Sequence, residues 1–136
     1  MPSCAADGVA CSRDPRVLAK PSFQFSEIDL RRIDHAVGGF CAAHRPRSAE
    51  PYVRLYHRVR GASVVLVEDR RHYLDETRWV TLPIARLCFD ADHRQWTLQW
   101  RRASGRWASY PGGLPVTNLD HLLQEIARDP ERLFWG

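Results

Sequence analysis

Aromatic and guanidinium side chains alternate along one short segment of the chain. Tyr52, Arg54, Tyr56, Arg58 and Arg60 stand at every second position, and in an extended strand every second side chain points to the same face. A face with aromatic planes beside cations can stack the bases of a single-stranded nucleic acid and pair with its phosphates. The segment therefore predicts a binding site for single-stranded nucleic acid or another anionic partner.

The same alternation also fits a solvated strand face that binds no ligand. Tyrosine and arginine each have an apolar stem and a polar tip, so they can cover a strand while their polar atoms stay in water. Charged side chains on an edge strand also prevent it from pairing with another chain. The segment lacks the aromatic signature of the known RNA-binding modules. Both interpretations therefore stay open at this point.

A second group of polar residues stands near the ends of predicted strands and consists of Glu68, Arg70, Arg86 and Arg102. If neighbouring strands pair as a meander, these side chains converge and can bind an anion. Glu68 and Arg70 also resemble the acidic-then-basic step of metal-dependent nucleases, where carboxylates hold Mg²⁺ and a cation stabilises charge on the phosphate. No second carboxylate stands on an adjoining strand, so a structural ion-pair network is the alternative.

Cys41 and His44 are three residues apart, and this spacing places both on one face of a helix as two corners of a zinc site. Cys4 and Cys11 would have to complete the site, but six residues separate them, whereas two to four are usual in zinc motifs. We therefore expect a buried thiol and imidazole. The sequence predicts no metal and no cofactor.

Nucleophilic catalysis has no visible apparatus in this sequence. There is no Gly-x-Ser-x-Gly elbow, phosphate loop or dinucleotide fingerprint. The remaining histidines form no paired spacing; they are His35, His57, His72, His93 and His121. Three tryptophans could stack a ligand, but when large aromatics alternate with polar residues they more often fill a core. We expect this of Trp96, Trp100 and Trp107.

Length and composition indicate one globular domain. The chain has 136 residues, of which 44% are hydrophobic and 26% charged, which is enough to build one core and excludes wholesale disorder. No apolar stretch approaches the length of a membrane span, and no signal-peptide pattern opens the chain. We expect a cytoplasmic protein without a membrane partner. The net charge of +4 permits an acidic partner, but its distribution matters more than its total.

Five segments have the alternation of strands. They are expected at 52–60, 63–68, 79–89, 96–101 and around 107–110. Gly61 offers a hairpin turn between the first two. Pro83 lacks an N–H group for the sheet, which implies an edge position or a bulge. In the fourth segment, Trp96, Leu98 and Trp100 form the apolar side.

A helix is predicted before these strands. Ser26 and Asp29, three residues apart, give its start signal, and Arg45 before Pro46 ends it. One face is expected to pack on the sheet and consists of Leu30, Ile33, Val37, Phe40, Cys41 and His44. Residues 1–22 contain Pro2, Gly8, Pro15 and Pro21 and show no apolar period, so we expect a flexible N-terminal arm.

A second helix is predicted after the strands. Thr117 with Asp120 opens it and Asp129 before Pro130 ends it. Its apolar stripe is Leu119, Leu122, Leu123 and Ile126. The apolar tail 133–135 is expected to dock on the core. The prediction for residues 23–136 is thus a single α+β domain, with an antiparallel meander of about five strands and one helix at each end.

Several spaced motifs resemble a family of small bacterial proteins, the domain of unknown function 3024 family. They are Trp96, Leu98, Trp100, Arg102 and Trp107, the preceding segment 83–86 and the chain end 134–136. Glu68, Asp69 and Arg70 also match a strand end of that family, although Arg71 stands where the family has Pro. The resemblance covers about residues 25–136 and implies this fold, but it transfers no substrate, cofactor or catalytic residue.

The functional prediction from sequence is a small non-enzymatic binding module for single-stranded nucleic acid or another anionic partner. A metal-dependent nuclease-like enzyme is one alternative, through Glu68 and its arginines. A protein-interaction domain that uses a sheet edge or the C-terminal aromatic residues is another.

Overall fold

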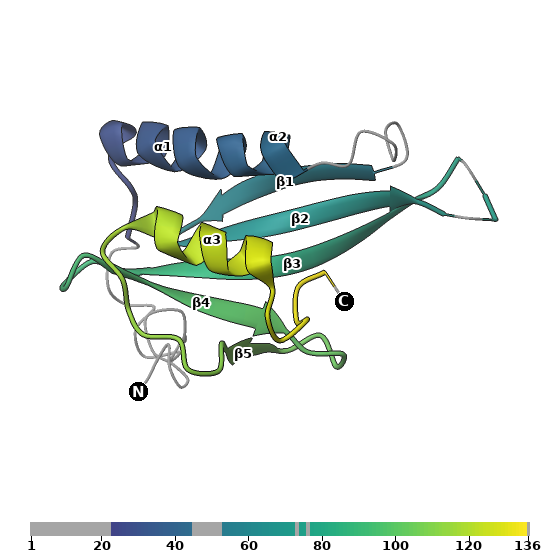
Figure 1. Cartoon of the computed structure of the whole chain (residues 1–136). Coiled ribbons are helices and arrows are strands. Elements are labelled where there is room, and N and C mark those ends of the chain that lie inside the picture. The colour runs from purple at the N-terminus through teal and green to yellow at the C-terminus, as the bar shows by residue number, and fades with distance from the viewer. Residues whose placement is uncertain (1–22, 45–52, 73, 76, 136) are drawn as a thin grey trace, which may run out of the picture.

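A computed structural model describes residues 23–44, 53–72, 74–75 and 77–135 of the chain. Five antiparallel strands form one sheet in the order β1-β2-β3-β4-β5 (Figure 1). A helical segment precedes the sheet and another helix follows it. The predicted α+β meander is therefore confirmed. The strands are β1 (Val53–Arg60), β2 (Ser63–Arg71), β3 (Trp79–Asp90), β4 (Gln95–Arg101) and β5 (Trp107–Ser109).

The first helical segment consists of α1 (Glu27–Ile33), the π-helix η2 (Asp34–Gly38) and α2 (Gly39–His44). As predicted, Ser26 is the N-cap, and its hydroxyl accepts a hydrogen bond of 3.1 Å from the Asp29 N–H. Burial of the predicted apolar face is confirmed for Ile33, Val37, Phe40 and Cys41. Two members of that face are exposed instead, Leu30 and His44.

The second helix, α3, spans Leu119–Arg128. Its N-cap is Asn118, whose side chain accepts a hydrogen bond from the Asp120 N–H; the prediction had placed the cap at Thr117. The predicted stop at Asp129 is confirmed, and this residue has a left-handed backbone with a φ of 43°. The tail docks as expected, since Phe134 is buried against Tyr110 at 5.5 Å between ring centroids.

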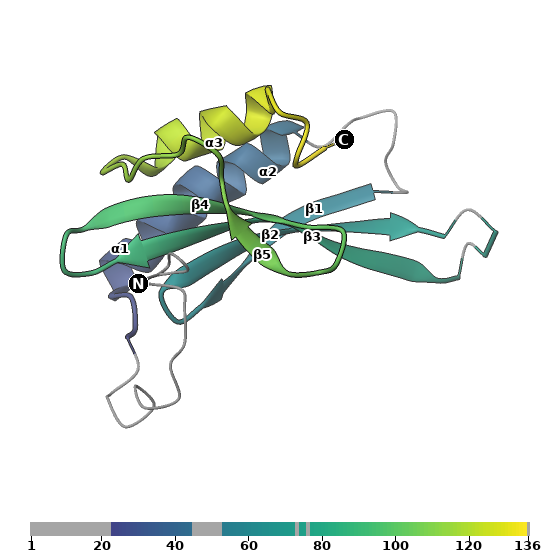
Figure 2. The ribbon, with the colours of Figure 1, turned by 90° about the horizontal axis from the view of Figure 1, so that it is seen from below.

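Both helical segments lie over the same face of the sheet, as the view from below shows (Figure 2). The core lies between them and this face. Its fully buried side chains include Val37 of η2, Leu66 of β2, Leu87 of β3 and Ile126 of α3. We call the other side of the sheet the helix-free face, because no helix among the described residues covers it.

Pro83 lies in the central strand β3, and the pairing between β2 and β3 shifts register beside it. Leu66 pairs with Ala85 and Val67 pairs with Pro83, so Ile84 is the extra residue of a bulge. Pro83 had implied an edge position or a bulge, and the structure shows the bulge. A residue without an N–H group fits there because a bulge interrupts the ladder of hydrogen bonds.

No helix among the described residues is long and apolar enough to cross a membrane. The predicted N-terminal arm 1–22, the predicted helix end at Arg45 and the first residue of the predicted binding strand, Tyr52, lie outside the described part of the chain.

Candidate nucleic-acid interface

A row of side chains crosses all five strands on the helix-free face. The register pairs Arg58 of β1 with Val65 of β2, Val65 with Arg86 of β3, Arg86 with Gln99 of β4, and Gln99 with Ser109 of β5. Neighbouring strands lie about 4.8 Å apart. Arg58 and Arg86 are therefore separated by one strand, and the apolar side chain of Val65 lies between them.

Two tryptophan rings on this face each carry a guanidinium group. The Arg54 Cζ lies 4.0 Å from the ring centroid of Trp79, and the Arg86 Cζ lies 5.0 Å from that of Trp107. The Arg71 Cζ also lies 5.4 Å from Trp79. Such contacts place a cation beside an aromatic plane. They join β1 to β3 and β3 to β5, so the cationic and aromatic groups extend across the sheet.

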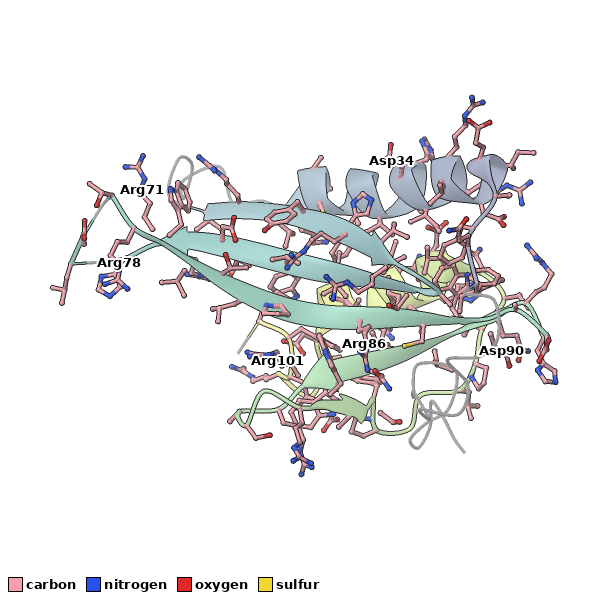
Figure 3. The ribbon with its side chains drawn as sticks, turned by 180° about the vertical axis from the view of Figure 1, so that it is seen from behind. Asp34, Arg71, Arg78, Arg86, Asp90 and Arg101 are labelled. Atoms are coloured by element: carbon pink, nitrogen blue, oxygen red, sulfur yellow. The ribbon has the colours of Figure 1, made fainter. Side chains whose placement is uncertain are left out.

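Arg86 is held in place by a buried amide. Its Nε donates a hydrogen bond of 2.7 Å to Oε1 of Gln99, and Gln99 is only 6% exposed. The amide fixes one side of the guanidinium, whose Cζ lies over the indole ring of Trp107. Figure 3 views the sheet from this side, with Arg86 and Arg101 on neighbouring strands in front of α3.

Tyr56 is the aromatic residue of β1 on this face. Its hydroxyl donates a hydrogen bond of 3.3 Å to Oδ1 of Asp69 on β2. Burial, and then the charge and the hydrogen bond of Asp69, raise the pKa of Tyr56. The neighbouring Val67 is fully buried. The phenol ring is therefore oriented by its neighbours on β2.

Positive charge exceeds negative charge on the helix-free face. Among the described residues, strand alternation places two carboxylates there, Asp69 and Asp90, and six arginines, which are Arg54, Arg58, Arg60, Arg71, Arg86 and Arg101. Asp69 binds Tyr56 and Asp90 binds His93. Within the described part of the chain, no carboxylate forms an ion pair with Arg58, Arg60 or Arg101.

The structure thus places four residues of the predicted binding strand, Arg54, Tyr56, Arg58 and Arg60, on the helix-free face. Sequence reasoning missed other members of this face. Trp107 was expected in the core, but it is half-buried on the opposite side, because its partner on β4 is Arg101 rather than Trp100. Trp79 could have been found from the alternation of the third segment, in which it shares a face with Thr81 and Pro83.

The predicted polar cluster does not assemble. Glu68 and Arg70 lie together on the face that the helices cover, where Arg70 donates from Nε at 2.7 Å and from Nη2 at 3.2 Å to the two carboxylate oxygens. These hydrogen bonds raise the pKa of Arg70. Arg86 lies on the helix-free face, and Arg102 is an exposed residue of the turn after β4. Register explains the separation, since Glu68 pairs with Leu82 whereas Arg86 pairs with Val65.

Cys41 and His44 have separate environments. Burial raises the pKa of the Cys41 thiol to about 11. The exposed His44 ring stacks on Phe40 at 4.0 Å, and its Nδ1 lies 3.0 Å from the Phe40 carbonyl oxygen. Among the described residues, no three His, Cys, Asp or Glu side chains are grouped so that they could hold a metal ion.

Comparison with known proteins shows which family the chain matches. The sequence profile of domain of unknown function 3024 matches residues 25–136. Searches among curated proteins and among solved structures found no match. The matched range covers the whole sheet, both helical segments and the docked tail.

Proposed function

The chain belongs to the domain of unknown function 3024 family, and for this member we propose that the helix-free face binds single-stranded nucleic acid. One observation supports this most strongly: Trp79 and Trp107, at different places on the helix-free face, each lie against a guanidinium group. Aromatic planes stack on bases of any sequence, while neighbouring cations pair with the phosphates.

The geometry favours a single strand over a duplex. In a duplex the base faces are stacked on each other, so tryptophan rings on a sheet cannot reach them. A single strand presents unstacked bases to the sheet and phosphates to Arg58, Arg60 and Arg101, which pair with no carboxylate of the described residues. Stacking contributes about 1–3 kcal/mol per base, so two rings can fix the position of a strand that the arginines attract.

Fluorescence anisotropy of a labelled oligothymidylate and a labelled oligouridylate of about twelve nucleotides tests the proposal. At low salt we expect binding that weakens as salt rises, with a log–log slope near about −3 if four phosphates are contacted. The double variant Arg54→Glu/Arg58→Glu should weaken binding at least about tenfold, because it reverses two charges of the face and removes the nearer of the two cations over Trp79.

The matched control is Arg31→Glu/Arg32→Glu, which reverses the same number of charges on α1, over the other face of the sheet. It should bind as the wild type does. Equal loss in both double variants would show that only net charge matters, and an unchanged anisotropy of the wild type at low salt would refute the proposal. A duplex of the same length should compete poorly.

The structure gives no support to a nuclease. A nuclease would need Glu68 as a metal ligand, but both carboxylate oxygens of Glu68 accept hydrogen bonds from Arg70. Glu68 also lies on the side of the sheet opposite Arg86. A phosphate held on the helix-free face would therefore lie across the sheet from this carboxylate. We propose binding without cleavage.

A further inference from the structure

A groove of about 890 Å³ lies between the start of α1, the start of α3 and the turn that joins β3 to β4. Its floor is aromatic: Phe25 stacks on Trp96 at 5.8 Å with an angle of 16° between the rings, and Phe89 lies 4.9 Å from Trp96. The groove opens on the side of the sheet that the helices cover. It is thus a different site from the helix-free face.

The apolar lining of the groove continues to its mouth. Ile28 of α1 lines it although its side chain is 62% exposed, and Ile33 and Leu119 line its deeper part as buried residues. The volume falls within the range of small-molecule sites, which are mostly apolar with a few polar groups that fix the orientation of the ligand. An exposed isoleucine beside an aromatic floor can cover an apolar chain.

The charged groups around the groove leave an excess of positive charge. Arg94 forms an ion pair with Asp29 at 3.6 Å, so these two largely compensate each other. Arg31 and Arg32 of α1 also line the groove and form no ion pair with a carboxylate among the described residues. Asp120 is the remaining carboxylate of the lining.

Two histidines complete the titratable groups of the lining. His93 contacts Asp90 at 2.8 Å, outside the groove, and His35 lies on the exposed side of η2. Neither adds negative charge to the rim. A cationic ligand would therefore meet two unpaired guanidinium groups, whereas an anionic ligand would be attracted by them.

We propose that this groove binds an amphipathic carboxylate with an unbranched alkyl chain. The chain lies on Phe25, Phe89 and Trp96 with Ile28 over it, and the carboxylate is held by Arg31 and Arg32. The apolar floor selects the chain and the unpaired guanidinium groups select the head group. This site needs no nucleic acid and would be retained if the helix-free face bound none.

Three ligands with the same chain and different head groups test the proposal: dodecanoate, dodecanol and dodecyltrimethylammonium, each below the concentration at which it forms micelles. Titration calorimetry and the fluorescence of the tryptophans, of which Trp96 lies in the floor, report binding. Dodecanoate should bind at least about tenfold more tightly than dodecanol, and the cation should bind most weakly, because the arginines favour only the anion. Equal binding of all three would overturn the proposal.

Variants locate the site. Ile28→Glu and Arg31→Glu/Arg32→Glu change exposed residues, so the fold should persist, and each should weaken dodecanoate binding about tenfold. The matched controls are Leu74→Glu, an exposed apolar residue at the far end of β2 and β3, and Arg54→Glu/Arg58→Glu on the helix-free face; both should bind dodecanoate normally. Loss in the controls, or none in the groove variants, would place the ligand elsewhere and refute the assignment.

Discussion

Asp129 holds the end of the chain with one carboxylate. Its Oδ1 accepts from the backbone N–H groups of Leu133 at 2.7 Å and Phe134 at 3.2 Å, and its Oδ2 accepts from those of Phe134 at 3.3 Å and Trp135 at 2.9 Å. The Trp135 indole N–H also donates to the Ile126 carbonyl at 2.8 Å. A short tail thus has its backbone donors satisfied and places Phe134 in the core.

Asp129→Ala should therefore destabilise the protein by about 2–4 kcal/mol. Hydrogen bonds to a charged acceptor contribute about 1.5–3 kcal/mol, and alanine in the left-handed region costs about 1 kcal/mol more. Asp129→Asn should cost only about 1 kcal/mol, since asparagine tolerates this backbone and keeps one acceptor oxygen. Urea unfolding measures both, and equal losses in the two variants would contradict this role of the carboxylate.

The raised pKa of Tyr110, which donates a hydrogen bond to Glu125, makes the stability of the fold depend on pH at the alkaline end. Burial, and then the hydrogen bond of 2.7 Å to Glu125, raise the pKa of Tyr110 to about 12. An unfolded tyrosine loses its proton near about pH 10. The contribution of protonated Tyr110 to the stability of the fold is therefore complete below about pH 10 and is lost as pH rises toward 12. Tyr110→Phe should remove this alkaline loss in urea midpoints measured across the range, and an unchanged loss would contradict it.

Glu125 makes the stability of the fold depend on pH at the acid end. Arg128, and then Tyr110, donate hydrogen bonds that hold the pKa of Glu125 below its ordinary value of 4.5. A lowered pKa stabilises the fold above the unfolded value, and this contribution is lost as pH falls through the folded one. Glu125→Gln should therefore reduce the loss of stability in acid. A steeper acid loss in this variant would rule out the assigned contribution.

The helical element at the start of the domain contains a feature that periodicity did not predict. Spacing of apolar residues predicted one helix, and its core positions Ile33, Val37 and Phe40 are buried as expected. The segment Asp34–Gly38 is nevertheless a π-helix. Ile33 and Val37 are four residues apart, and positions at this spacing lie near the same face in an α-helix and in a π-helix alike. The sequence pattern therefore cannot distinguish the two forms over five residues.

Gly39 begins α2, and replacing it should stabilise this element. Its φ of −63° and ψ of −41° are those of a right-handed helix, and an added Cβ would meet no atom within 4 Å. Gly39→Ala should raise the free energy of unfolding by about 0.5–1 kcal/mol, because alanine loses less conformational entropy on folding. Gly38→Ala is the comparison, since its Cβ would lie 3.8 Å from the His57 ring. Destabilisation by Gly39→Ala would contradict an open helical site.

Strand positions were predictable from alternation because a sheet with one covered face imposes a period of two. The five predicted segments match β1 to β5, although β2 extends three residues beyond the predicted Glu68, to Arg71. Which side chains of neighbouring strands lie side by side depends on the register of the pairing, and the bulge at Pro83 and the short β5 determine that register. Because alternation alone does not give the register, two predictions were wrong. Glu68 and Arg86 were expected together but lie on opposite faces. Trp107 was expected in the core but lies outside it.

On the scale of the whole molecule, the single layer of helices divides the protein into two sides with different chemistry. The covered side contains the core and the groove with its aromatic floor, and the helix-free face carries the arginines and two tryptophans. Two charge-reversal variants, one on each side, test whether the two sides bind their ligands independently. Arg54→Glu/Arg58→Glu should affect only nucleic acid, and Arg31→Glu/Arg32→Glu should affect only dodecanoate.

The distance between the two tryptophans spans much of the helix-free face. Ala85, Trp100 and Ala108 form one row across β3, β4 and β5, and Trp107 lies one position and Trp79 six positions before this row. With a rise of about 3.3 Å per residue and about 4.8 Å between strands, the two positions are about 19 Å apart. A short oligonucleotide can therefore engage only one of them.

Affinity should consequently depend on oligonucleotide length in a way that reports both rings. In an oligothymidylate series from about four to sixteen nucleotides, binding by the wild type should tighten steeply until the strand reaches from Trp79 to Trp107 and only slowly after that. Trp107→Ala should remove the steep rise and leave the affinity of the shortest strands nearly unchanged, because a short strand can still stack on Trp79. A variant that lost the same factor at every length would show that the two tryptophans do not act as separate stacking positions along one bound strand.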